Sequence, residues 1–314
     1  MDEKNFTNWI LNNIEFIKKD NNDALPRESP FGTRKKNATT ICTGDDEKRC
    51  VKKFINLETR IRTSPKYNLI SCLIQKNMST LLQAIMCLLY DEILFLKSSR
   101  NLIYETSNIR LCRKVNEFNS PYKAIQNYNK TISKDSWRYL AITRNPIDRF
   151  ISNFIDRCIR KPIKGIKSCN GCNFNMTCFV ITEYQYMLKE STTKVMRKEF
   201  EDMHFFPQNW RCDFRRLLSN YTIIRYKNKN NNDIEDVVNS LNNIFYQQHV
   251  PNTTLTFIRN QLLFSRTMHT TVDTGARKFF EDRLINSPFL MEYVIRMYYY
   301  DFKLFNYTIP ELQF

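Results

Sequence analysis

Two short stretches of the sequence carry side chains suited to binding anions. The first, Gln75–Thr80 (Q-K-N-M-S-T), combines a lysine with two hydroxyl groups. Such a turn at the start of a helix adds unpaired backbone N–H groups and the positive end of the helix dipole. The second contains Arg144 and, eight residues later, Ser152, and an arginine fork suits a phosphate group. Together they predict a ligand with two separated phosphate-type groups.

The elements that must position these residues can be inferred from the hydrophobic pattern. Apolar runs predict strands at Leu69–Ile74, Tyr139–Thr143 and Tyr221–Tyr226. Helical spacing follows each one, and the predicted helices are 80–96, 147–159 and 234–245. Strands that alternate with helices predict an α/β fold with a central parallel sheet flanked by helices. Ligands of such sheets bind at the carboxyl ends of the strands, where both stretches fall.

Each motif also has a simpler reading when it is taken alone. Ser79 or Thr80 could cap the helix that follows, without any ligand. Arg144 could form a surface ion pair with Asp148. The Lys-x-x-Ser-Thr spacing also lacks the flanking glycines of a phosphate-binding G-x-x-x-x-G-K-[ST] loop. The two motifs therefore gain their weight from occurring together.

Composition limits the possible functions of the 314 residues. Only 5 glycines are present, and no G-x-G-x-x-G candidate exists for dinucleotide binding. The net charge of +16 favours anionic partners. Because no basic run is interleaved with aromatic residues, we expect no nucleic-acid partner. Residues 1–66 are polar and interrupted by prolines, and we expect them to form a peripheral arm before a domain that spans 67–314.

Four stretches of the chain resemble the Golgi carbohydrate sulfotransferases, the family of the chondroitin 4-O- and HNK-1 sulfotransferases, and more closely a divergent nematode branch of it. They are C-L-I-Q-K-N-M-S-T from Cys72, T-R-N-P-I-D-R-F-I-S-N-F from Thr143, H-F-F-P-Q-N-W-R-C from His204, and the chain from His269 onward. The resemblance implies a P-loop-like sulfotransferase fold over roughly residues 67–314. It implies an enzyme that moves a sulfuryl group from 3′-phosphoadenosine 5′-phosphosulfate to a glycan hydroxyl, with chondroitin or another glycosaminoglycan as acceptor.

The resemblance also assigns roles by position. The loop residues expected to bind the 5′-phosphosulfate are Lys76, Asn77, Met78, Ser79 and Thr80. The residues expected to bind the 3′-phosphate are Arg144 and Ser152. The family often has a small residue where Asn77 or Met78 stands in this chain.

Sulfuryl transfer needs stabilisation of developing charge and a base for the acceptor hydroxyl. Lys76 is the expected electrostatic catalyst, and no metal is required. His204 is our first candidate for the base. The alternatives are His269, a carboxylate such as Glu183 or Glu190, or a histidine at 204 that only packs under a loop.

Ten cysteines and eight Asn-x-Ser/Thr sequons favour a secretory compartment, and the resemblance implies the Golgi lumen. No signal peptide or transmembrane segment is visible, although the family is usually membrane-anchored. We expect Cys169, Cys172 and Cys178 to form disulfides rather than a zinc site. For Cys42 and Cys50, the sequence leaves two alternatives equally open, a disulfide that closes a small loop or two free thiols. Cys72 and Cys87 are expected to act as small apolar core residues.

Other functional classes remain as alternatives. A non-catalytic relative would keep the fold and bind an acidic glycan or a nucleotide without turnover. A nucleotide kinase is disfavoured by the missing glycines and by the lack of a magnesium-binding aspartate after a strand.

Overall fold

The structure is a computed structural model, and it describes residues 13–33, 41–55, 57, 59–105, 109–128, 137–160, 168–193, 202–227, 231–263 and 275–314. The chain divides into two compact units. Unit 1 comprises Met1–Ile55, Pro146–Pro207 and His269–Phe314, and unit 2 comprises Asn56–Asn145 and Gln208–Met268. Each unit is assembled from stretches that lie far apart in the sequence.

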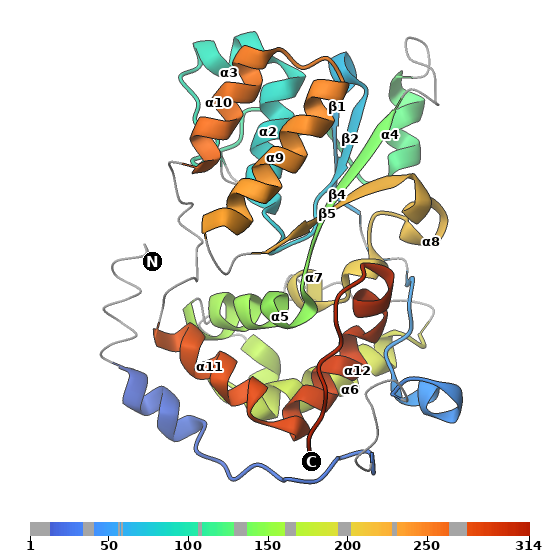
Figure 1. The fold of residues 1–314 in the computed structure, drawn as a ribbon, viewed down its shortest axis with the longest axis vertical. Helices are drawn as coiled ribbons and strands as arrows, with labels where there is room; N and C mark the ends of the chain where they lie inside the picture. The colour runs from blue at the N-terminus through green and yellow to red at the C-terminus, as the bar shows by residue number, and fades with distance from the viewer. Residues whose placement is uncertain are drawn as a thin grey trace. The chain divides into compact units, whose positions relative to one another are not determined.

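Unit 2 is built on a five-stranded sheet (Figure 1). In spatial order its strands are β3 (Glu117–Phe118), β1 (Ile61–Ser64), β2 (Leu69–Cys72), β4 (Arg138–Arg144) and β5 (Tyr221–Tyr226). The three predicted strands correspond to β2, β4 and β5, and they run parallel. The sheet as a whole is mixed, because β1 is antiparallel to both β2 and β3. The α/β class is therefore confirmed, with two strands that were not expected, β1 and β3, of which only β1 runs opposite to the others.

Strand β1 precedes residue 67, where we expected the sheet to begin. Its four residues, I-R-T-S, are all buried and pair with β2. Three of the four, Arg62, Thr63 and Ser64, are polar. A search for apolar runs therefore misses this short buried strand. The stretch 1–66 thus includes one strand of the sheet, and the arm itself stays a prediction.

Helices pack against the sheet of unit 2. On one side, Figure 1 draws α2 (Ser79–Tyr90), α3 (Glu92–Lys97), α9 (Asn231–Gln247) and α10 (Asn252–Leu263). On the other side lies α4 (Pro121–Tyr128), and the short α8 (Phe214–Leu217) precedes β5. The single helix predicted over 80–96 is divided because Asp91 leaves the helical conformation. Its carboxylate instead caps α3 by accepting a hydrogen bond from the N–H of Leu94 (2.9 Å).

All ten cysteines form disulfides. The five pairs are Cys42–Cys50, Cys72–Cys212, Cys87–Cys112, Cys158–Cys169 and Cys172–Cys178. The pairing confirms the disulfides expected among residues 169–178, and it rules these thiols out as zinc ligands. The expectation for Cys72 and Cys87 was wrong: both lie in core elements, but each is bonded to a partner from a region where no core element was predicted.

Unit 1 is helical. Its α-helices include α5 (Pro146–Phe154), α6 (Met176–Glu190), α7 (Asp202–Phe205), α11 (Gly275–Ile285) and α12 (Pro288–Leu304), and residues 13–20 are helical as well. Its 3-10 helices include Gly44–Arg49 and Ser168–Gly171. The helix predicted over 147–159 begins as α5 and continues as a π-helix over Ile155–Arg160. Pro288 occupies the first position of α12, where a proline is well accommodated.

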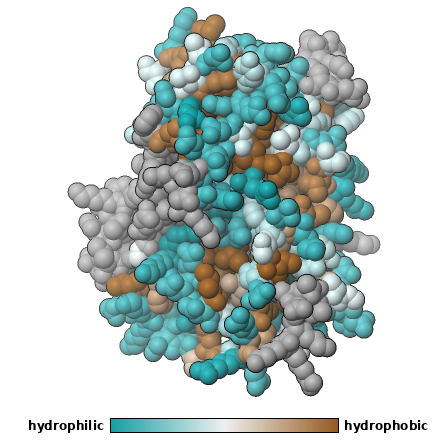
Figure 2. Space-filling view, in the orientation of Figure 1, coloured by the Kyte–Doolittle hydropathy of each residue, from teal (hydrophilic) through white to brown (hydrophobic). Residues whose placement is uncertain are grey.

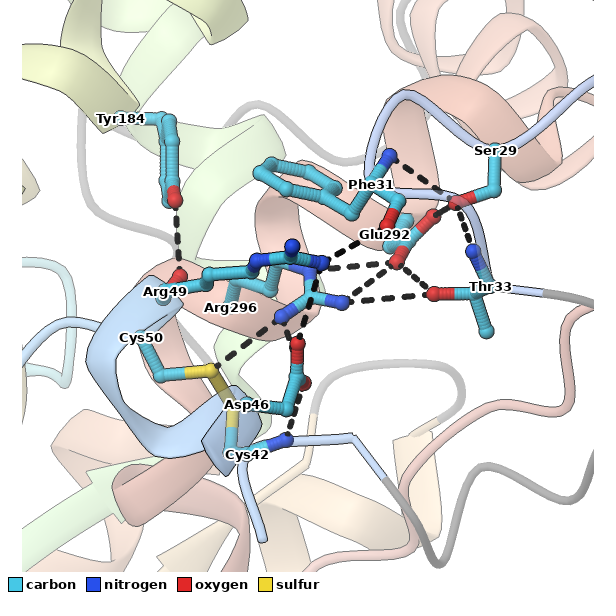
Figure 3. A network of polar contacts seen from close by, with 10 residues as sticks. All are labelled: Ser29, Phe31, Thr33, Cys42, Asp46, Arg49, Cys50, Tyr184, Glu292 and Arg296. Atoms are coloured by element: carbon cyan, nitrogen blue, oxygen red, sulfur yellow. Dashed lines mark hydrogen bonds and ion pairs between the residues drawn. A yellow bond between two sulfur atoms is a disulfide. The ribbon is translucent and has the colours of Figure 1, made fainter. Parts of the chain in front are cut away.

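A buried charge network attaches the N-terminal segment to α12 (Figure 3). The guanidinium of Arg296 donates to Glu292 (2.7 Å) and to Asp46 (2.7 Å), and it lies over the ring of Phe31. Glu292 also accepts hydrogen bonds from the hydroxyls of Ser29 and Thr33, both at 2.6 Å. The buried charges of Arg296 and Glu292 are therefore satisfied by each other and by Ser29, Thr33 and Asp46.

The surface in Figure 2 is largely hydrophilic with separate hydrophobic areas. Exposed apolar side chains include Ile93, Leu94 and Leu96 of α3. Within the described residues, no helix combines the length and the apolar character needed to cross a membrane.

Candidate functional site

The loop after β2 turns sharply before α2 begins. Lys76 and Met78 both have left-handed backbone conformations, with φ of 66° and 57°. Residues other than glycine adopt this region rarely, which gives a physical reason for the small residue that the family often has at this point. Met78 occupies the cap position of α2, so Ser79 and Thr80 are its first two residues and neither caps the helix. Their side chains are partly exposed at the helix start, as an anion site requires.

Asn77 faces the interior. It is 1% exposed, and its Nδ2 donates to the carbonyl of Ile142 in β4 (2.9 Å) and to Oε1 of Gln208 (2.6 Å). The first bond attaches the loop to the neighbouring strand, and the second attaches it to Gln208. The side chain expected to contact the ligand is therefore committed to the protein, whereas the backbone of the loop remains suited to an anion.

Arg144 ends β4 beside this loop, in the same unit. Its Nη1 donates to the carbonyl of Lys76 (3.3 Å), and its guanidinium lies over the ring of Tyr226, 5.2 Å from the centroid. Tyr226 is the residue paired with Arg144 on β5. The ring and the carbonyl together hold the guanidinium next to the loop. The structure thus brings Lys76 and Arg144 together, as the two motifs predict.

Gln208 joins the two motifs, and sequence reasoning missed it. Its Oε1 accepts from the N–H of Arg144 (3.0 Å) as well as from Asn77, and its Nε2 donates to the carbonyl of Arg144 (2.9 Å). It lies in the 3-10 turn Gln208–Trp210 and is fully buried. The available signal was its position in the resembling stretch from His204 to Cys212.

Two further bonds hold the turn that carries Gln208. The Cys72–Cys212 disulfide connects the end of β2 to the residues that follow the turn. The N–H of Leu57 donates to the carbonyl of Trp210 (3.0 Å). The loop after β2, the end of β4 and the turn Gln208–Trp210 are therefore three connected segments of one candidate anion site.

The remaining candidates lie in unit 1. Ser152 is buried on α5, in the helix that begins two residues after Arg144. His204 is on α7, with a partly exposed side chain, and its carbonyl accepts hydrogen bonds from Arg149 Nη2 (2.6 Å) and Asn153 Nδ2 (2.7 Å). Arg149 is the second arginine of R-N-P-x-x-R-x-x-S, so the motif contains a residue that holds the histidine segment.

Aromatic packing also fixes the position of α7. Phe205 packs against Phe150 and Phe179, with ring centroids 6.1 and 4.6 Å apart. The carbonyl of Phe205 accepts a hydrogen bond from the hydroxyl of Tyr298 (2.8 Å). Backbone contacts and buried rings together hold the residue next to His204, so the histidine is part of an ordered segment.

The other candidates for the base are two glutamates and a second histidine. Glu183 and Glu190 are both buried on α6, and Glu183 accepts a hydrogen bond from Asn170 (2.8 Å). His269 lies outside the described residues. Among the described residues, no cluster of three or more histidine, cysteine or acidic side chains could hold a metal ion.

Comparisons with known proteins identify relatives of this chain. The chain is 38% identical over 304 residues to the uncharacterized protein C18B2.2 of Caenorhabditis elegans. The aligned region covers 96% of this chain and 82% of that protein. The chain is also 32% identical over 263 residues to the carbohydrate sulfotransferase chst-1 of the same nematode, covering 83% and 79%. No solved structure matches significantly. Because the match to the family called "Sulfotransferase family" extends over residues 59–308, the chain belongs to the sulfotransferase family.

Proposed function

We propose that this sulfotransferase uses 3′-phosphoadenosine 5′-phosphosulfate and transfers its sulfuryl group to a glycan hydroxyl. The observation that carries the proposal is the contact between Arg144 and the Lys76 carbonyl, which places two cationic residues at the ends of adjacent parallel strands. Such a pair suits a donor that is phosphorylated at both ends. The similarity to a protein named carbohydrate sulfotransferase supports a glycan acceptor, and chondroitin is the first glycosaminoglycan to test.

Each residue has a distinct role in this proposal. Lys76 and the first backbone N–H groups of α2 stabilise the charge that builds up on the 5′-phosphosulfate oxygens. Arg144 binds the 3′-phosphate. Ser152 also contacts the 3′-phosphate, a role that rests on the resemblance of its motif to that of the family. His204 removes the proton of the acceptor hydroxyl. In-line transfer then breaks the sulfur–oxygen bond to the nucleotide phosphate and forms a bond from sulfur to the acceptor oxygen.

The donor half is tested by binding of adenosine 3′,5′-bisphosphate, measured by calorimetry. Lys76→Ala and Arg144→Ala should each weaken binding about tenfold to hundredfold, since a hydrogen bond to a charged group contributes about 1.5–3 kcal/mol. Lys97→Ala is the matched control, because it removes the same charge from an exposed site in the same unit. Unchanged binding in both site variants would contradict the assignment.

The acceptor half needs a transfer assay with labelled donor and a panel of desulfated glycans that includes chondroitin. Label on one glycan, lost in Lys76→Ala, supports the enzyme and identifies its acceptor. Donor binding without transfer to any glycan would favour the non-catalytic relative that binds a nucleotide or an acidic glycan.

We also propose that the chain works in the lumen of the secretory pathway, in the Golgi by family resemblance. The support is that all ten cysteines pair in five disulfides, which persist in oxidising compartments and are rare in the cytosol. Expression of the protein in an oxidising and in a reducing compartment tests this. Equal yields of active protein from both would contradict it.

A further inference from the structure

We infer that Gln208 is a positioning residue that sets the spacing between the 5′-phosphosulfate loop and Arg144. This role rests on the proposed donor site and names a residue that neither motif contains. The carboxamide has three bonds on the two segments it connects, to Asn77 and to both backbone groups of Arg144.

The chemistry of the side chain explains why it is suited to this position. A primary amide has one oxygen with two lone pairs and one nitrogen with two hydrogens. Gln208 Oε1 accepts two bonds, and Nε2 donates to the same residue from which Oε1 accepts. The pair of bonds to Arg144 resembles the two bonds that the N–H and C=O groups of one residue in an antiparallel strand form with the residue opposite. Gln208 therefore gives β4 hydrogen-bond partners beyond the point where its pairing with β2 ends.

The backbone around Gln208 is itself held in place. The disulfide at Cys212 and the bond from Leu57 connect the turn to β2 and to the residues before β1. Because of these attachments, the turn cannot simply move to compensate for a displacement of the 5′-phosphosulfate loop. The distance between loop and arginine is consequently set by Gln208 as well as by the pairing of β2 with β4.

This geometry predicts a specific effect on ligands. A donor with phosphates at both ends gains affinity when its two sites are held at the right separation, because the second contact is then intramolecular. Loss of Gln208 should weaken the two-phosphate ligand and affect ligands with one phosphate much less. The loss of a purely structural residue would instead weaken all ligands to the same extent, through the folded fraction.

The experiment compares adenosine 3′,5′-bisphosphate, adenosine 5′-phosphate and adenosine 3′-phosphate. Gln208→Met keeps most of the side-chain volume and removes all three hydrogen bonds. We expect bisphosphate affinity to fall about tenfold or more, with each monophosphate changed less than about threefold. Lys76→Ala should selectively weaken the 5′-phosphate, and Arg144→Ala should selectively weaken the 3′-phosphate.

Asn116→Ala is the matched control. Asn116 is another buried carboxamide of unit 2, at 1% exposure, and it donates to the carbonyls of Thr63 and Met86 (both 3.2 Å). Its loss should lower stability without changing the ratio of bisphosphate to monophosphate affinity.

The outcomes separate this role from the proposed function. If the wild-type protein binds bisphosphate more tightly than either monophosphate and Gln208→Met keeps that ratio, the role of Gln208 is wrong while the donor site stands. Equal weakening of all three ligands also overturns it. If the wild-type protein binds none of them, the proposed function fails, and this role fails with it.

Discussion

Arg149 Nη2 donates a hydrogen bond to the carbonyl of His204 over 2.6 Å, and both residues belong to stretches that the sulfotransferase resemblance marks. Nη1 of the same guanidinium donates to the carbonyl of Phe206 (3.1 Å). Arg149 is 1% exposed, and its guanidinium donates hydrogen bonds to the backbone of α7 and of the residue after it, rather than to a ligand. The second arginine of the motif therefore has a structural partner near the proposed base.

Replacement of Arg149 should affect turnover through His204. Arg149→Lys keeps the charge but loses the fork, and we expect kcat to fall about tenfold to hundredfold because small misplacements of a reacting group are costly. In a His204→Ala background, the same replacement should have little further effect. Steady-state kinetics of the two single variants and the double variant test this coupling. Fully additive losses, or a His204→Ala enzyme with the turnover of the wild-type protein, would contradict it.

The Cys72–Cys212 disulfide should contribute more to stability than Cys42–Cys50. The two bonds join residues 140 and 8 positions apart, and loop-closure entropy gives about 5 and about 2.5 kcal/mol, respectively, as upper values. Paired Cys→Ser variants examined by urea unfolding test this order. The Cys72/Cys212 variant should also lose bisphosphate affinity, because the turn with Gln208 loses one of its attachments. The Cys42/Cys50 variant, altered only in unit 1, is the control.

The Arg296 network should tolerate loss of the whole charge pair better than loss of one member. Arg296→Met leaves Glu292 buried without its cation, which should cost about 3–5 kcal/mol. A double variant, Arg296→Met with Glu292→Gln, should be closer to the wild-type protein. Thermal or urea unfolding of both variants decides this, and a double variant less stable than the single one would contradict it.

The sequons should differ in glycan occupancy. Asn220, Asn252 and Asn306 are exposed, whereas Asn77 is buried. The side chain of Asn175 is engaged, because its Nδ2 donates to the carbonyl of Asp20 (2.6 Å) while its Oδ1 caps α6.

Protein secreted from an animal cell line, analysed by peptide mass spectrometry before and after glycan removal, tests this pattern. Exposed sequons should carry glycan, and the two engaged ones should not. Glycan on Asn77 in folded, active protein would contradict the interior position of that side chain.

The parts of the fold set by local pattern could be predicted. Strands β2, β4 and β5 are short apolar runs next to helical patterns, so the sequence indicated both turns of the proposed donor site and the residues Lys76 and Arg144. Strand β1 escaped because three of its four residues, Arg62, Thr63 and Ser64, are polar. Gln208, Arg149 and Cys212 escaped because their roles depend on partners more than fifty residues away, and nothing in the local sequence indicates such partners.

The separation of 140 residues between Cys72 and Cys212 has a consequence for biosynthesis. When Cys72 leaves the ribosome, its native partner has not been made, while Cys87 and then Cys112 emerge soon after it. A wrong early bond between Cys72 and one of these thiols can be corrected only by thiol–disulfide exchange. Strand β4 likewise cannot pair with β5 at once, because β5 begins 77 residues after the end of β4. Productive maturation should therefore depend on an oxidoreductase that reshuffles early bonds, and disulfide exchange, with its timescale of seconds to hours, should limit the rate at which active protein appears.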